Sequence, residues 1–331
     1  MATYLTTIET HTCGHPTRIV VGGLPMFDGD SVADKRTHAR RDHDGLRTLL
    51  CCEPRGHEGM YVAYVVPSEI ADVGIIFASQ VGYDDMCGHG LIGVVTGLFE
   101  SGWLPHKNIV RLETPAGIVI AQAHWNGQRV SEVSFKSVPA FLYERDVTVI
   151  VPKFGKIKGD LAFGGNWFLY VDINKIESGM KERSIISMLR LGGAIKREVN
   201  RAIQIRHPEQ PSIAQNLLGI SFYGLPLKHE NSHQANLVVE SETFYDRSPC
   251  GTGTCGRMAV LYCLGELLIG EEFRNEGIAG GVFRGVASGI TKVGPLPAIR
   301  PQLTGSASIT GQGKWRLDDY DILGASGWTG S

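Results

Sequence analysis

Short apolar runs separated by glycine and turn residues dominate the first half of the chain, and this pattern predicts strands. We expect strands in the runs 17–21, 60–66, 73–79, 109–112, 118–125 and 129–135. The last two runs meet at Asn126-Gly127, a strong local signal for a β-hairpin. Ser31 and Asp34 have the spacing of a capping box, which predicts a polar helix from there to about Leu50.

The period of the pattern changes after Cys87, where the chain becomes apolar on nearly every side. Gly90, Gly93 and Gly97 recur there among leucine, isoleucine, valine and phenylalanine residues. Small residues at this spacing let other backbone come close to a helix. We therefore expect a buried central helix that begins at Gly88.

The second half of the chain repeats this order. We expect strands at 147–151, 220–223, 236–240, 277–290 and 303–310, a helix over 182–203 with a weak point at Gly192-Gly193, and an apolar helix directly after Cys250. Cys250 follows Cys87 by 163 residues in a chain of 331, and both open a Cys-Gly-polar-Gly helix start. The sequence thus predicts a duplicated α/β (α+β) fold, with residues 1–148 carrying Cys87 and 149–331 carrying Cys250. We allow for the C-terminal tail packing back onto the first half.

The composition is that of a compact globular protein, with 43% hydrophobic and 20% charged residues. A formal net charge of −2 gives no electrostatic footprint for nucleic acid or a membrane surface, so we expect neither partner and favour a small neutral or zwitterionic molecule. The first residues lack the pattern of a secretory signal, and no window approaches 18 apolar residues, so we expect a cytoplasmic protein. Seven cysteines without dense spacing favour free thiols over a disulfide framework.

Cys87 and Cys250 are the candidate catalytic residues, because each is expected where a helix begins. Unpaired backbone N–H groups and a partial positive charge at such a position lower the pKa of a thiol and bind a carboxylate. Two thiols on opposite sides of one α-carbon suit inversion, because one abstracts a proton while the other donates one. A racemase works in both directions, so two groups of the same kind fit it.

Simpler interpretations stay open for single residues. A free cysteine is often an inert core residue. We assign that structural role to Cys13, Cys51, Cys52, Cys255 and Cys263. Asp246, four residues before Cys250, is either a receptor for a substrate ammonium or a turn residue. Asp84 and Asp85 are expected to be turn residues, and His89 is either structural or in contact with the substrate.

Other site chemistries have weaker signals. The segment 251–254 has the glycine spacing of a phosphate loop, but no Lys-Ser/Thr follows it. A zinc site from Cys87, His89, Cys250 and Cys255 has poor ligand spacing, so we expect no metal. A Cys–His nucleophile pair has no specific signal. The alternatives from other classes are a thiol-based redox or metal-binding protein and a non-catalytic binding protein that has kept the pocket.

Motifs along nearly the whole chain resemble those of the proline racemase family. They are His11-Thr12 with Pro16-Thr17-Arg18, Glu53-Pro54-Arg55-Gly56-His57, Met86-Cys87-Gly88-His89-Gly90, Phe163-Gly164-Gly165-Asn166-Trp167 and the long motif from Asp246 to Thr254. The last of these is highly specific. Cys13-Gly14-His15 stands where Gly-Gly-Glu is usual, and Cys255-Gly256 where Ser-Ala is usual.

The resemblance implies a fold like that of diaminopimelate epimerase: two pseudo-symmetric halves, each a curled sheet or barrel around a central helix, with the active site in the cleft between them. It implies an enzyme without a cofactor, in which Cys87 and Cys250 are the proton acceptor and donor. The residues expected to hold the substrate carboxylate are Gly88, His89, Gly251 and Thr252. Asp246 is expected to meet the ring nitrogen. Family members are commonly homodimers, so we expect a homodimer.

The family includes proline racemases, 4-hydroxyproline 2-epimerases and trans-3-hydroxyproline dehydratases. The dehydratases usually carry threonine in place of the second cysteine, so Cys250 favours inversion of an imino acid over elimination. Gly219 stands where 4-hydroxyproline epimerases tend to carry a histidine for the ring hydroxyl. Hydroxyproline is therefore placed only slightly ahead of proline, and another proline analogue stays open.

Overall fold

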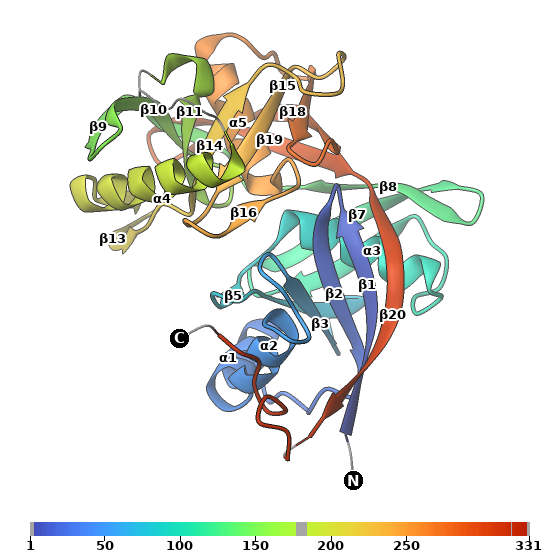
Figure 1. Ribbon diagram of the computed structural model, residues 1–331. Coiled ribbons are helices and arrows are strands. Elements are labelled where there is room, and N and C mark those ends of the chain that lie inside the picture. The colour runs from blue at the N-terminus through green and yellow to red at the C-terminus, as the bar shows by residue number, and fades with distance from the viewer. Residues whose placement is uncertain (1–2, 177–183, 319, 330–331) are drawn as a thin grey trace. The chain divides into compact units, whose positions relative to one another are not determined.

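Figure 1 shows the computed structural model of the protein, which describes residues 3–176, 184–318 and 320–329. The chain forms two compact units, Met1–Phe135 with Gly305–Ser331, and Lys136–Thr304. The boundary expected at 148/149 falls inside strand β9 (Phe141–Val151), so the observed division differs from the expected one. The physical reason is strand pairing, because β9 pairs along most of its length with β10 of the second unit.

The first unit is a mostly antiparallel sheet with few helices. Its helices are α1 (Val32–Asp42), α2 (Asp44–Cys51) and α3 (Gly88–Glu100). Its strands are β1 (Thr3–Thr12), β2 (His15–Gly22), β3 (Tyr61–Val66), β4 (Val73–Ala78), β5 (Tyr83–Asp84), β6 (Ile109–Thr114), β7 (Gly117–Asn126), β8 (Arg129–Lys136) and β20 (Ala307–Leu317). They pair in the order β20, β1, β2, β3, β4, β6, β7 and β8, with β5 on β4.

The second unit has the same character. Its helices are the short η1 (Ile173–Lys175), α4 (Ile185–Ala202) and α5 (Gly251–Leu264). Its strands are β9, β10 (Gly155–Phe163), β11 (Trp167–Asp172), β12 (Ile205–His207), β13 (Gln210–Gln215), β14 (Gly219–Gly224), β15 (Gln234–Val239), β16 (Tyr245–Asp246), β17 (Glu272–Gly277), β18 (Val282–Val293) and β19 (Leu296–Gly305). They pair in the order β9, β10, β11, β14, β15, β17, β18 and β19, with β16 on β15; β12 and β13 form a separate ribbon.

The two units pair their strands in the same order and sense. Starting at β20 or at β9, the successive pairings are antiparallel, antiparallel, parallel, antiparallel, parallel, antiparallel and antiparallel. The duplication inferred from the two cysteines is confirmed as a repeat of architecture. β20 holds the place of β9, although it comes from the other end of the chain. The C-terminal tail belongs to the first unit for this reason.

Each unit has a buried apolar helix against its sheet, as expected. Every residue of α3 except Glu100 is buried. A Cβ atom on Gly93 would lie 2.8 Å from Oγ1 of Thr10, and one on Gly97 would lie 2.6 Å from Cδ1 of Ile19. Glycine at these positions therefore lets β1 and β2 lie close to the helix. In the second unit, α5 contacts β9, β10, β11 and β18.

Some elements differ from the expected ones. The capping box at Ser31 is confirmed, but the helix does not continue to Leu50, because it stops at His43 and α2 begins there. The strand expected at 303–310 is interrupted at Ser306, where β19 ends and β20 begins. α4 runs without a break through Gly192-Gly193, and the expected helix start at 182 lies outside the described residues. The hairpin at Asn126-Gly127 is confirmed.

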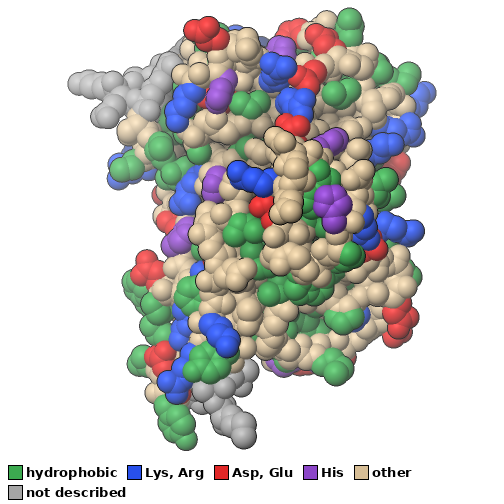
Figure 2. All heavy atoms as spheres, turned by 90° about the vertical axis from the view of Figure 1, so that its right-hand side faces the viewer, with side chains coloured by type: hydrophobic (Ala, Val, Ile, Leu, Met, Phe, Trp, Pro, Cys, Tyr) green, Lys and Arg blue, Asp and Glu red, His purple; other side chains and the backbone are tan. Residues whose placement is uncertain are grey.

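Acidic and basic side chains are interspersed on the face shown in Figure 2, with hydrophobic side chains between them. No extended area of one charge is seen on that face of the described chain. Among the described residues, no helix has both the length and the apolar character that crossing a membrane requires. All seven cysteines lie in the described part of the chain, and none forms a disulfide.

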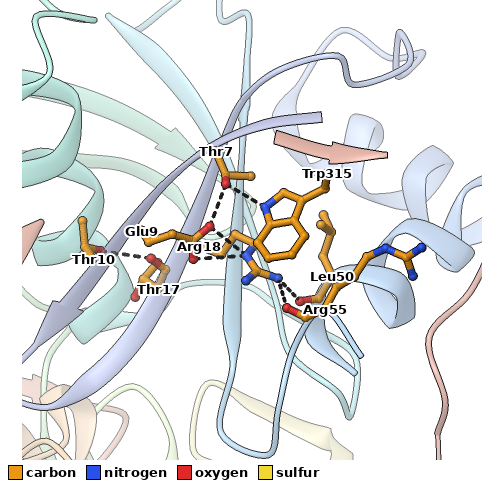
Figure 3. Close-up of polar contacts among 8 residues, drawn as sticks. All are labelled: Thr7, Glu9, Thr10, Thr17, Arg18, Leu50, Arg55 and Trp315. Atoms are coloured by element: carbon orange, nitrogen blue, oxygen red, sulfur yellow. Dashed lines mark hydrogen bonds and ion pairs between the residues drawn. The ribbon is translucent and has the colours of Figure 1, made fainter. Parts of the chain in front are cut away.

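A buried ion pair ties distant segments of the first unit together (Figure 3). The Arg18 guanidinium donates to the Glu9 carboxylate at 2.9 and 3.1 Å. It also donates to the carbonyl oxygens of Leu50 at 2.8 Å and of Arg55 at 2.6 Å. The guanidinium carbon lies 4.1 Å from the centre of the Trp315 ring. Arg18 therefore joins β1, α2, the loop after α2 and β20 through one side chain that is 5% exposed.

Replacing Arg18 by methionine should destabilise the first unit strongly. The Arg18→Met change removes the charged donor of a partly buried carboxylate, which keeps only the Thr7 hydroxyl, and a donor of two carbonyl oxygens, so we expect the free energy of unfolding to fall by about 3 kcal/mol. Denaturant titration followed by tryptophan fluorescence measures it. The matched control is Arg41→Met, which breaks the exposed pair with Asp42 and should cost less than about 1 kcal/mol. Equal losses in the two variants would contradict the linking role of Arg18.

Candidate active site

Cys87 lies at the N-terminal cap of α3, in the first unit. Its backbone is extended, with φ −133° and ψ 117°, and its carbonyl accepts the first helical hydrogen bond, from Leu91. The side chain is 7% exposed. The Cys87 sulfur lies 3.3 Å from Nδ1 and 3.8 Å from Nε2 of His89. A thiol and an imidazole thus meet at the start of this helix, although no specific sequence signal marked a Cys–His pair.

The His89 imidazole is held in place by two other rings. The His15 ring centre lies 4.4 Å away and the Tyr61 ring centre 4.6 Å away, both nearly perpendicular to the imidazole. The Thr12 hydroxyl donates to the His89 carbonyl at 2.7 Å. His89 is 5% exposed. These contacts come from β1, β2 and β3, so the sheet of the first unit fixes the ring beside the sulfur.

Cys250 lies at the N-terminal cap of α5, in the second unit. Its φ of 61° and ψ of 114° put it in a region that side-chain-bearing residues rarely adopt, so the backbone there is strained. Its N–H donates to the Ser248 hydroxyl at 3.1 Å, and the Ser248 N–H donates to the Asp246 carboxylate at 2.8 Å. The Cys250 sulfur lies 4.0 Å from the Thr252 hydroxyl. The motif residues from Asp246 onward therefore form one tight turn that fixes the position of the Cys250 thiol.

A buried polar cluster holds the peptide before Cys250. The Pro249 carbonyl accepts from the side chains of Asn236 at 2.8 Å, Asn275 at 3.2 Å and Thr254 at 3.0 Å. Strained backbone persists when surrounding contacts over-determine it. Three donors on one carbonyl, from β15, β17 and α5, provide such contacts.

The Gly164-Gly165-Asn166 stretch packs directly against the first turns of α5. A Cβ atom on Gly164 would lie 2.2 Å from the Thr252 carbonyl oxygen and 2.3 Å from the Gly256 nitrogen. Gly165 has a φ of 110°, which glycine alone adopts without strain. The Asn166 side-chain amide donates to the Thr252 hydroxyl at 3.5 Å. This motif, weak as a sequence signal, therefore sets the position of the helix start.

Strand register reveals a residue that the sequence interpretation missed. Asp246 of β16 pairs with Val238 of β15, and Asp84 of β5 pairs with Phe77 of β4. β5 and β16 occupy the same place in the two repeats, one turn before the cysteine of each helix. Asp84, expected to be a turn residue, is thus the first unit's counterpart of Asp246. The internal symmetry of the sequence was the available signal, but the aspartates lie three and four residues from their cysteines.

The ionisation of these groups follows from their burial. Burial raises the pKa of the Cys250 thiol well above its usual value, and the nearby Asp246 and Glu240 charges add to it. The Gly253 N–H and the Thr252 hydroxyl act in the opposite direction. The helix-start N–H therefore acts in the expected direction on the pKa of this thiol, but burial and the two carboxylates outweigh it. Burial also raises the pKa of Asp84 to about 6, although a hydrogen bond from Tyr61 opposes the shift.

The other predicted residues fall into two groups. Gly88 and His89 form the first turn of α3, and Gly251 and Thr252 form the first turn of α5. Their positions present backbone N–H groups at the start of each helix. Gly219 begins β14, and a Cβ atom there would lie 2.7 Å from the Val239 carbonyl oxygen. A histidine could not occupy that position without moving the backbone of β15.

The close contact at Gly164 gives a direct test of how the α5 start is held. Gly164→Ala inserts a methyl group against two backbone atoms that have no side-chain freedom, so we expect a loss of about 2 kcal/mol in the free energy of unfolding. Gly289→Ala, in the same unit but with no heavy atom within 4 Å of its Cβ position, is the matched control. Thermal and denaturant unfolding measure both. If the two variants are equally stable, Gly164 does not set the helix position.

Asp84 should leave a signature in the pH dependence of stability. Its pKa is about 6 in the folded chain against an ordinary value of 3.8, so the folded state binds more protons between these values. The free energy of unfolding should therefore fall as pH rises from about 4 to 6, and the full cost of the buried charge is present at pH 8. Asp84→Asn should stabilise the protein at pH 8 by about 1 kcal/mol and not at pH 4. Asp85→Asn, at an exposed neighbour, is the control, and the same pH effect there would contradict the assignment.

Comparisons by family model, by sequence and by structure all match this chain to proteins that are named for action on proline or hydroxyproline. The family model for proline racemase matches residues 7–328. The trans-3-hydroxy-L-proline dehydratase of Burkholderia ambifaria is 39% identical over 324 residues, and the proline racemase of Acetoanaerobium sticklandii is 39% identical over 323 residues, each match covering 96% of both chains. A solved structure of a hydroxyproline epimerase from Agrobacterium vitis, with bound trans-4-hydroxy-L-proline, matches with a TM-score of 0.86 at 29% identity, over 98% of this chain and 94% of that one. With a match over nearly its whole length, the chain belongs to the proline racemase family.

Proposed function

We propose that this protein is a cofactor-independent racemase or epimerase that inverts the α-carbon of a cyclic imino acid, hydroxyproline ahead of proline. The observation that carries the proposal is the equivalence of two helix starts, since Cys87 and Cys250 cap counterpart helices in the two repeats. Relatives named proline racemase and hydroxyproline epimerase support the substrate class. Membership of their family favours an isomerase over the thiol-based redox or metal-binding alternative.

The substrate carboxylate is held by backbone N–H groups at the two helix starts. Gly88 and His89 contribute from α3, and Gly251 and Thr252 contribute from α5. The partial positive charge of each helix start stabilises the carboxylate, and it stabilises the enolate-like charge more strongly when the α-proton leaves. Asp246 accepts a hydrogen bond from the protonated ring nitrogen. This neutralises the charge that otherwise raises the pKa of the Cys250 thiol.

The two thiols divide the proton transfer between them. One thiolate takes the α-hydrogen, the electron pair of the broken C–H bond stays on the substrate, and the other thiol delivers a proton to the opposite face. The reverse reaction exchanges the two roles, which is why two groups of one kind serve both directions. The buried setting of Cys87 and Cys250, 7% and 6% exposed, keeps water away from the carbanion.

Dehydration of trans-3-hydroxyproline is the second candidate, because relatives at 39% identity carry that name. It shares the first step, removal of the α-proton, and differs in the loss of the neighbouring hydroxyl as water. Cys250 argues for inversion, because it keeps a second proton donor where the family's dehydratases usually have threonine. Gly219 argues against a histidine-type contact to a 4-hydroxyl, since β15 backbone fills the space beside it.

The two candidates give different products in D2O. A panel of L- and D-proline and of cis and trans hydroxyprolines, followed by polarimetry and mass spectrometry, should show inversion with one deuterium at the α-carbon. A dehydratase would instead yield a cyclic imine and no inverted imino acid. Exclusive dehydration would overturn the proposed inversion.

Serine at either catalytic cysteine should abolish inversion. Cys87→Ser and Cys250→Ser each remove one of the two proton-transfer groups, so we expect the rate of inversion to fall by at least about a hundredfold. Cys263→Ser, at an exposed cysteine of the same helix as Cys250, is the matched control and should keep full activity. Full activity in either of the first two variants would show that its cysteine does not transfer the proton.

A further inference from the structure

A second carboxylate faces the Cys250 thiol, and the proposed function gives it no role. Side chains alternate between the two faces of a strand. Val238 of β15 packs with Cys250 in one apolar cluster, whereas Val239 belongs to the cluster on the opposite face, with α4. Glu240 comes next and extends the pairing by one residue, because its N–H donates to the Phe244 carbonyl at 3.0 Å. The Glu240 side chain therefore lies on the face that carries Cys250.

The charges around the sulfur agree with this direction. Asp246 pairs with Val238, so these two side chains share a face of the sheet. Burial raises the pKa of the Cys250 thiol, and the charges of Asp246 and Glu240 raise it further. Two carboxylates from the hairpin of β15 and β16 therefore lie near one thiol.

The neighbouring strand has no side chain beside Glu240. Ile220 of β14 pairs with Val239, so the register puts Gly219 opposite Glu240. A Cβ atom on Gly219 would lie 3.5 Å from the Glu240 Cα and 2.7 Å from the Val239 carbonyl oxygen. A larger residue would therefore push β15 away. Glu240 is the member of this cross-strand pair that offers a polar group to the Cys250 face.

Helix α4 holds the backbone at Glu240. The Lys196 ammonium donates to the Glu240 carbonyl at 2.7 Å. A Cβ atom on Gly193 would lie 2.5 Å from Cγ of Glu242, in the turn that follows β15. The Gly192-Gly193 pair, expected to weaken α4, thus lets this turn pack closely on the helix. The backbone of Glu240 is fixed before any substrate arrives.

The first unit holds the same turn without an acidic side chain. The register of β4 with β5 and of β15 with β16 makes Ser79 the counterpart of Glu240. The Arg47 guanidinium donates to the Ser79 carbonyl at 3.0 Å, as Lys196 does to the Glu240 carbonyl. Both repeats therefore share the backbone contact. The carboxylate of Glu240 is not needed for it, and its place beside the thiol calls for another role.

We propose that Glu240 is a specificity-determining residue, which accepts a hydrogen bond from a ring hydroxyl of the substrate. The inference rests on the proposed function and narrows it to hydroxylated cyclic imino acids. An ionised carboxylate only accepts hydrogen bonds, and bonds to a charged acceptor are roughly twice as strong as neutral ones. Proline has a methylene group where the hydroxyl stands and offers no donor. Asp246 keeps its contact with the ring nitrogen, which is common to both substrates.

The ratio of kcat/KM values for two substrates measures this role. Inversion is followed for L-proline and for the 3- and 4-hydroxyprolines, and the best hydroxyproline is compared with L-proline. In Glu240→Leu, kcat/KM for that hydroxyproline should fall about thirtyfold, and kcat/KM for L-proline should change by less than about threefold. Removal of the Glu240 charge also changes the reactivity of Cys250. That effect is common to both substrates and cancels in the ratio.

Two further variants control for the loss of charge and for folding. Glu242→Leu, at the exposed partner of Arg197 in the same turn, should leave the ratio unchanged. Glu240→Gln keeps the size of the side chain and a neutral acceptor, so its ratio should lie between those of the unmodified protein and Glu240→Leu. It also serves as the test if Glu240→Leu does not fold. An unchanged ratio in a folded Glu240 variant, or an unmodified protein that prefers L-proline to every hydroxyproline, overturns the proposal.

Binding separates this proposal from the proposed function. Isothermal titration calorimetry with L-proline and with the hydroxyprolines needs no turnover, and its affinity ratios should change in the same way. Inversion with an unchanged ratio in Glu240→Leu would refute the role of Glu240 and leave the proposed function standing. Binding of hydroxyproline that depends on Glu240, without inversion of any imino acid, would refute the proposed function and leave the role of Glu240 standing.

Discussion

The structure depends on how closely the backbone of each sheet can approach the start of a central helix. Gly164 lies so near α5 that an added methyl group would meet the Thr252 carbonyl oxygen at 2.2 Å, and Gly93 lies nearly as close to Thr10. A helix start carries unpaired N–H groups, and these need a ligand or solvent. The glycine contacts fix the position of each capping cysteine.

The chain repeats one plan with two kinds of chemistry. The order and sense of strand pairing are the same in both units. In each unit, a two-residue strand with the sequence Tyr-Asp comes shortly before the capping cysteine. The side chains around the sulfur atoms have diverged, with an imidazole on one side and a hydroxyl on the other. A reaction that runs in both directions tolerates such a difference, because equilibrium between two isomers is set by the substrates and not by the catalyst.

Local sequence signals predicted most helices and hairpins, but they could not predict which distant strands pair with each other. The Asn126-Gly127 hairpin, the Ser31 capping box and the buried helix after Cys87 follow from neighbouring residues, and all three are confirmed. The place of β20 beside β1 depends on residues about 300 positions apart, which no local pattern encodes. The break at His43 was missed although the local sequence marks it, since Asp42-His43-Asp44-Gly45 combines poor helix formers with a glycine. Asp84 was taken for a turn residue because it and Asp246 lie at different distances from their cysteines, so their equivalence becomes clear in the strand register.

The backbone at Cys250 is strained, and hydrogen bonds formed on folding supply the free energy that holds the thiol in this position. A residue with a side chain at φ 61° is held there at a cost of about 1–3 kcal/mol, and the three donors on the Pro249 carbonyl supply the stabilisation. The cost is met when the chain folds, before any substrate arrives. Binding energy is then free to stabilise charge on the substrate instead of bending the protein. The strained backbone at Cys250 needs such support from its surroundings. Buried donors from β15, β17 and α5 provide it by bonding to one carbonyl oxygen.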